Sequence, residues 1–141
     1  TLGGGSQQAA AGNHTHAGTG SGNLLSSTVV TFGAVASTHL YTVPAGKKCL
    51  VIDIFIRGSS ASLNQATDPI VKFGWSDADG DVKSSTTLAL DLVGGYCRLL
   101  TYNAVQRLGA AGDILHANVT QACTDNPTTA IVEVTGYLID A

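Results

Sequence analysis

Charged side chains are scarce in this 141-residue chain. Lys, Arg, Asp and Glu make up 12% of it, against roughly 25% in an average domain. The seven basic residues are scattered singly and the formal net charge is −3, so the chain lacks the basic stripe that nucleic-acid binding requires. We therefore expect no nucleic-acid partner, and a surface of hydroxyl and amide groups suited to lying against other protein.

Long apolar runs and cysteine motifs are also missing. No stretch approaches the roughly 18 apolar residues of a membrane-spanning helix, and the N-terminus lacks the layout of a signal peptide. We expect no membrane partner. The three cysteines have no CxxC spacing, which argues against a zinc site. Cys49 and Cys97 lie in apolar runs and are expected to behave as small buried residues.

Catalytic motifs are absent as well. The chain has no GxSxG elbow, and its glycine-rich stretches precede neither a lysine nor a helical pattern, so they do not predict a phosphate-binding loop. For His39 and His116 the sequence identifies no partner residues that would complete a catalytic site, so both are expected to be structural. The sequence therefore predicts that the protein is not an enzyme.

What the chain does contain is a pattern of short strands. After a glycine-rich, uncharged segment, runs of β-branched and aromatic residues alternate with Gly, Asp, Asn and Pro clusters. We expect an all-β fold, an eight-stranded antiparallel β-sandwich, jelly-roll-like, at 24–141, with an extended N-terminal arm at 1–23. The eight expected strands are Leu25–Phe32, Thr38–Val43, Lys48–Arg57, Ile70–Trp75, Thr86–Leu92, Tyr96–Tyr102, Asp113–Thr120 and Ala130–Ile139.

Alternation along two runs predicts which side chains face inward. In the run 48–57, Leu50, Ile52, Ile54 and Ile56 fall on one side, and the other side is also mostly apolar, which indicates a central strand covered on both faces. A neighbouring subunit could cover the second face. In the run 130–139, one side carries Ile131, Glu133, Thr135 and Tyr137 and is semi-polar, so it could be exposed.

Three connections have a turn or loop composition. Val43–Gly46 pairs proline with glycine and is expected to close a hairpin before the central strand. The polar stretch 58–69 is expected to be an exposed loop. Asp77, Asp79 and Asp81 alternate like the start of a calcium loop, but Val82 and Leu88 stand where an EF-hand needs glycine and a bidentate acid. A hairpin turn is the favoured interpretation, with a weaker calcium site as the alternative.

The arm holds the one pattern typical of a metal ligand set. In an extended segment His14 and His16 point the same way and can reach one ion. One chain supplies only two ligands, whereas three chains around a threefold axis would supply six nitrogens for a divalent transition ion such as iron or nickel. Two histidines in a tail are, on the other hand, commonly just solvated.

A resemblance adds to this interpretation. The string 13–22, which reads NHTHAGTGSG, resembles the DHTHAG-type segments of bacteriophage tail-fibre and related virion proteins. In trimeric phage fibres such HxH motifs can bind an iron on the threefold axis, which implies that role for His14 and His16. Asn13 stands where those proteins often have Asp. The stretches 41–48, 111–113 and 134–138 are similar to small β-sandwich domains of phage head-decoration and fibre proteins.

The resemblance implies a virion structural protein on the phage particle surface. The expected form is a homotrimer that serves as capsid decoration or cement, or as a knob or short fibre, and attaches to other virion proteins through the arm. The alternative is a receptor- or carbohydrate-binding module at a fibre tip. Exposed aromatics, acids and amides that could form its site are Trp75, Tyr96, Tyr102, Asp77 and Asn103.

Overall fold

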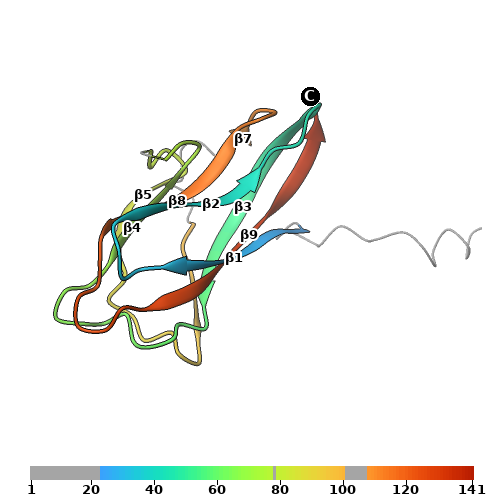
Figure 1. Cartoon of the computed structure of the whole chain (residues 1–141). Helices are drawn as coiled ribbons and strands as arrows, with labels where there is room; N and C mark the ends of the chain where they lie inside the picture. The colour runs from blue at the N-terminus through green and yellow to red at the C-terminus, as the bar shows by residue number, and fades with distance from the viewer. Residues whose placement is uncertain (1–22, 78, 101–107) are drawn as a thin grey trace, which may run out of the picture.

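Nine strands form two antiparallel sheets in the computed structural model, which describes residues 23–77, 79–100 and 108–141 (Figure 1). The strands are β1 (Asn23–Thr31), β2 (Ala36–Thr42), β3 (Lys47–Arg57), β4 (Ile70–Gly74), β5 (Lys83–Thr87), β6 (Tyr96–Arg98), β7 (Leu108–Gly109), β8 (Ile114–Gln121) and β9 (Thr129–Asp140). The described residues form no helix, and so none that could span a membrane. The predicted all-β class is confirmed.

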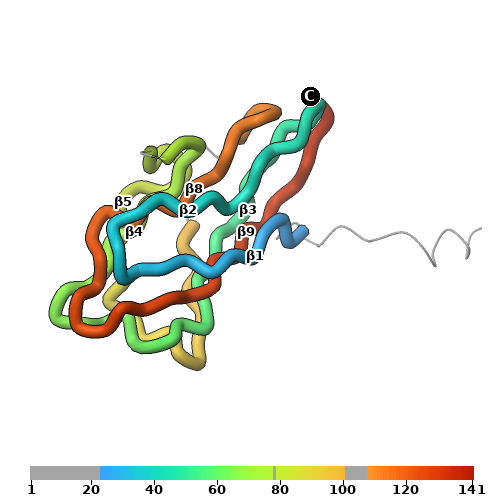
Figure 2. Tube along the Cα trace, in the orientation of Figure 1, coloured from blue at the N-terminus to red at the C-terminus, as the bar shows by residue number. Residues whose placement is uncertain are grey.

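The strand order is that of a jelly roll. The first sheet runs β1-β9-β3-β6, with β7 also paired to β3, and the second runs β2-β8-β4-β5. The chain crosses between the sheets at every step except β4 to β5 and β6 to β7, so most strands that follow one another in sequence lie in opposite layers (Figure 1). Figure 2 shows the connections 32–35, 58–69, 88–95 and 122–128 gathered at one end of the sandwich.

The ninth strand, β7, is two residues long and lies outside the eight expected strands. Leu108 pairs with Leu50 and Gly109 with Cys49, on the same side of β3 as β6. β6 and β7 are thus two pieces of one edge strand along β3. A strand of two residues is too short to show the alternation of apolar and polar side chains, which explains why the sequence predicted eight strands.

The inward face of β3 differs from the predicted alternation. A β-bulge between Val51 and Asp53 shifts the register against β9, and a bulge moves every later side chain to the other face. The buried set is therefore Cys49 and Val51 before the bulge, and Ile54 and Ile56 after it. For β9 the predicted alternation is confirmed, since Val132 and Val134 are buried and the Ile131 side is half-buried.

The core fills the space between the sheets with aliphatic and aromatic side chains. Its largest fully buried members are Phe32, Phe73, Ile54, Ile56, Leu63, Leu88 and Leu115. The cysteines are all unpaired: Cys49 and Cys123 are buried, and Cys97 is half-buried against the core. Burial raises the pKa of the Cys49 thiol to about 11, so this thiol stays protonated and behaves as the small apolar residue that was predicted.

Two loop predictions need correction. Gly46 does adopt a positive φ of 73° and Lys47 N–H bonds Pro44 C=O at 3.2 Å, but β2 and β3 belong to different sheets. The turn therefore carries the chain across the sandwich and closes no hairpin. The stretch 58–69 is only partly exposed, because Leu63 is fully buried. Its Gln65 side chain donates to Asn126 C=O and accepts from Asn126 N–H.

Gly136 provides a test of the β3–β9 pairing. It faces Val51 beside the bulge, where a Cβ would overlap the carbonyl oxygen of Leu50 and lie 3.1 Å from Leu25 Cδ1. Because that carbonyl belongs to the backbone of β3, it cannot move aside cheaply. We predict that Gly136→Ala lowers the free energy of unfolding by about 1–3 kcal/mol, measured by urea denaturation. Gly94→Ala, where no atom lies within 4 Å of the new Cβ, is the control and should change it by less than about 0.5 kcal/mol.

Candidate interaction surface

Large apolar side chains are exposed mainly on one sheet. In the described part of the chain, six of the eight such residues lie in strands of the first sheet and a seventh, Val93, leads into β6. The six are Leu24, Val29, Tyr96, Leu108, Leu138 and Ile139. The eighth, Val35, lies in the β1–β2 connection, so the described strands of the second sheet expose none. Scattered apolar residues are normal on a surface, whereas segregation to one face indicates contact with another molecule.

The strand register places Val29, Tyr96 and Leu108 in two rows across the outer face of the first sheet, whereas Leu138 lies opposite the buried Cys49 and faces the other way. Leu50 is paired with Tyr137 on one side and with Leu108 on the other. Arg57 is paired with Ile131 and with Tyr96, and Ile131 is in turn paired with Val29. The second row reaches both edges of the sheet, with Tyr96 and Val29 exposed at its ends and Ile131 half-buried between them, whereas the first row ends at the half-buried Tyr137.

Two ion pairs occupy the middle of this face. The Arg57 guanidinium donates to both oxygens of the Glu133 carboxylate, at 2.7 and 3.4 Å. Arg98 pairs with Asp53, which is 1% exposed and also accepts the Ile54 N–H at 2.9 Å. The hydrogen bond from Arg57 holds the pKa of Glu133 below its ordinary value. These four charges cancel within the face.

A shallow hollow lies at the β6 side of the same face. Its volume is about 360 Å³ and it is lined by Arg57, Gly58, Val93, Gly94, Gly95 and Tyr96. Tyr96 is 70% exposed, and its ring meets that of Phe55 at a centroid separation of 6.0 Å. The hollow has apolar walls at Val93 and Tyr96 and one hydrogen-bonding wall at Arg57, so it fits an apolar side chain or one face of a ring.

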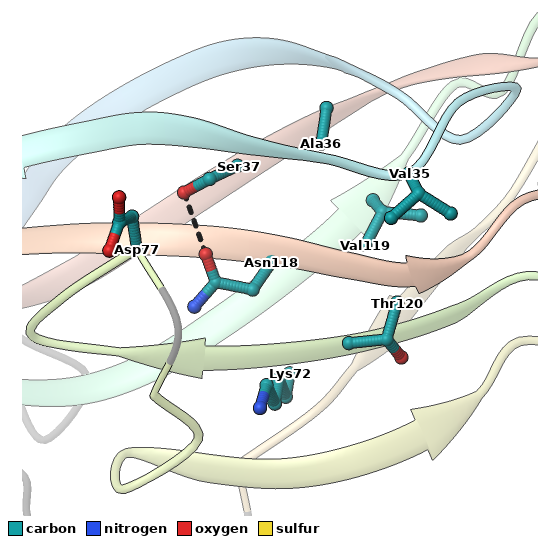
Figure 3. A pocket seen from close by; sticks show the side chains of 8 residues that line it. All are labelled: Val35, Ala36, Ser37, Lys72, Asp77, Asn118, Val119 and Thr120. Carbon is teal, nitrogen blue, oxygen red and sulfur yellow. Dashed lines mark hydrogen bonds between the residues drawn. The ribbon is translucent and has the colours of Figure 1, made fainter.

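A second cleft, on the outer face of the second sheet, is held by Asn118 (Figure 3). This side chain is buried, accepts a hydrogen bond from Ser37 Oγ at 2.7 Å, and donates to the carbonyls of Ser76 and Asp79. It thereby fastens the β4–β5 connection over the sheet. The cleft of about 390 Å³ is lined by Val35, Ala36, Ser37, Lys72, Asp77, Asn118, Val119 and Thr120.

The residues predicted for a carbohydrate site are not brought together. Trp75 packs against the core, and its ring lies over Gly109, where a Cβ would come within 2.5 Å of Cη2. Asp77 lines the cleft on the second sheet, while Tyr96 stands on the first. Tyr102 and Asn103 lie outside the described residues. The structure therefore leaves Tyr96 as the one described aromatic of this set that is presented to solvent beside a hollow.

The metal and calcium predictions have different outcomes. His14 and His16 lie outside the described residues, so their role stays a prediction. Within 23–77, 79–100 and 108–141 no three His, Cys, Asp or Glu side chains gather as a ligand group. Asp81 instead accepts the Trp75 N–H at 3.1 Å within the β4–β5 hairpin. His39 and His116 pair across β2 and β8, with bonds to Thr42 Oγ1 and Ile114 C=O.

The Arg98–Asp53 pair was missed at the level of sequence. A single acid within the apolar run KCLVIDIFIR was the available signal, because a carboxylate in such a run needs a charged partner. The partner lies 45 residues further along the chain. Only the β3–β6 pairing identifies it.

Comparison with solved structures agrees with the fold. A chain of the cyanophage Pam1 capsid asymmetric unit superposes with a TM-score of 0.56 and 18% sequence identity, over 91% of this chain and 96% of that one. No protein-family model and no curated protein matches the sequence. The likeness establishes a shared two-sheet architecture over almost the whole of both chains.

The Arg57–Glu133 pair predicts a pH dependence of stability. Because the folded-state pKa of Glu133 is below its ordinary value of 4.5, the pair stabilises the fold above that value, and this contribution is lost as the pH falls through the folded-state pKa. Glu133→Gln should be slightly less stable than wild type at pH 7, and the gap should narrow progressively as the pH falls below 4.5. Urea midpoints at pH 7, 5 and 3.5 measure this. Asp140→Asn removes the more exposed pair with Lys47 and should have the smaller effect at pH 7. A gap for Glu133→Gln that is as large at pH 3.5 as at pH 7 would contradict the assignment.

Proposed function

We propose that the chain is a structural protein of a phage virion, located on the particle surface, and that it catalyses no reaction. The observation that carries the proposal is the superposition, over nearly the full length of both chains, with a chain of the Pam1 capsid asymmetric unit. The phage-like segment 13–22 and the sparsely charged composition support the same role. A shared fold does not by itself establish a function. The segment 13–22 and the low charge content are sequence features that do not depend on the superposition.

The role we favour is that of a homotrimeric decoration, cement, knob or short-fibre protein attached through its N-terminal arm. The arm would enter the folded domain at Asn23, the first residue of an edge strand of the first sheet. Twenty-two extended residues span up to about 70 Å, which is enough to reach a neighbouring subunit. Three arms on one trimer would turn a weak contact into a multivalent one.

A second candidate, a receptor- or carbohydrate-binding module, has one observation in its favour. Tyr96 presents an exposed ring beside a hollow with a guanidinium on its wall, and aromatic faces of this kind can stack on sugars. Trp75 supports it less, because its ring packs over Gly109. We therefore rank this role below the structural one.

Removal of the arm tests the attachment mechanism. A chain lacking residues 1–22 keeps every described strand, so its thermal unfolding midpoint should match that of the full chain. Its binding to particles stripped of the protein should fall by roughly a hundredfold or more, because three tethers are lost together. Co-sedimentation with the particles measures this. If the shortened chain binds as the full chain does, the arm is not the attachment device.

The two arm histidines allow a separate prediction. If His14 and His16 meet their copies on a threefold axis, the untagged trimer should contain one transition-metal ion, iron or a similar ion, per three chains. Elemental analysis of the full protein and of the double variant His14→Ala/His16→Ala measures this, and the variant should contain none. Absence of metal from the wild-type trimer would remove the metal proposal and leave the arm as an uncomplexed tether.

A further inference from the structure

We infer that copies of this chain meet edge to edge through the first sheet, and that the apolar residues at its two opposite edges join in a closed ring. The inference rests on the proposed homotrimer and identifies the surfaces that would form it. We call Leu24 and Val29 the β1 margin, and Val93 and Tyr96 the β6 margin.

The first step is the position of the exposed apolar residues. β1 and β6 are the two ends of the strand order β1-β9-β3-β6, so three strand spacings, about 14 Å, separate the margins. Val29 is 64% exposed on one margin, and Val93 is 56% and Tyr96 70% exposed on the other. A chain with two separate apolar patches has one to offer to each of two neighbours.

The second step concerns the charges between the margins. The Arg57 and Arg98 side chains are 45% and 63% exposed and already paired within the face. A face-to-face dimer would bury both ion pairs and strip water from the two guanidinium groups, which is unfavourable unless new partners are supplied. Contact at the margins leaves Glu133, on β9, outside the interface, and the Arg57 guanidinium on the wall of the hollow keeps this carboxylate as its partner.

The third step is the difference between the margins. The β6 margin contains the hollow of about 360 Å³ between Arg57 and Tyr96, whereas the β1 margin presents the aliphatic side chains of Leu24 and Val29. A hollow on one edge and aliphatic side chains on the other are complementary. This arrangement is a head-to-tail contact, which generates a ring when the rotation closes, rather than a contact of one patch with itself.

Three matched valines test the inference in the full-length protein. Val29→Lys alters the β1 margin and Val93→Lys the β6 margin, while Val35→Lys places the same charge at an equally exposed valine (67%) that lines the cleft of the second sheet instead. Either margin variant should raise the trimer dissociation constant at least tenfold, because burying a lysine ammonium in an apolar contact is unfavourable. Val35→Lys should leave it within about twofold. Sedimentation velocity measures the mass, and circular dichroism with thermal unfolding checks the fold; Leu24→Lys replaces Val29→Lys if the latter does not fold.

Mixing the two margin variants separates a ring from a symmetric pair. Val29→Lys retains an intact β6 margin and Val93→Lys an intact β1 margin, so an equimolar mixture should form a particle of two chains that grows no further. A dimer formed by either variant alone would show that the intact margin contacts its own copy, and would overturn the ring. A mixture that stays monomeric would overturn the contact between the two margins. Unchanged trimers in both single variants, or equal disruption by Val35→Lys, would overturn the choice of surface.

The outcome for the virion role is measured separately. If the wild-type chain is a monomer at tens of micromolar, the ring inference fails, while co-sedimentation with particles still decides whether the protein is a virion component. If the ring forms as inferred but no particle binds it, the proposed function fails and the assignment of the two margins stands.

Discussion

The pairing of β3 with β9 is the constraint on which the other features of the domain depend. These are the two longest strands, and they lie side by side in the interior of the first sheet. The bulge at Ile52 divides β3 into two halves with opposite phase. One half contributes Cys49 and Val51 to the core and the other contributes Ile54 and Ile56, so a single strand fills the sandwich along its whole length. Gly136 lies opposite the bulge and lets the two backbones approach.

The same bulge determines the character of the outer face. It turns Asp53 toward Arg98 rather than into the core, and it places Phe55 and Arg57 beside Glu133 and Ile131 on β9. The charges of the two ion pairs consequently neutralise one another on this face, and most exposed apolar side chains of the sheet lie in or beside its edge strands, the exceptions being Leu138 and Ile139 on β9. The second sheet is built differently, with Asn118 using its amide to hold a loop over the strands. The two outer faces are thus chemically distinct although they belong to one small domain.

The sequence predicted much of the fold because side-chain alternation and turn composition depend only on residues close together in the chain. The β9 pattern from Ala130 to Tyr137, the all-β class and the two-sheet architecture all follow from them. Features that depend on distant residues were not predictable. The bulge in β3 breaks an alternation that looked regular, and β7 gains its strand character only by pairing with β3. Leu63 is buried in a loop where its N–H bonds the distant Leu90 C=O. In the candidate surface, Val29 and Val30 are indistinguishable in sequence, yet one is exposed and the other fully buried. Only the register against β9 separates them.

The burial of the thiols has a chemical consequence for the domain. The chain contains no methionine, and of its three sulfur atoms those of Cys49 and Cys123 are enclosed in the core, leaving only that of Cys97 partly accessible. Oxidants attack thiolates and thioethers first. With so little oxidisable sulfur within reach, the domain offers few atoms at which oxidation could disturb its packing.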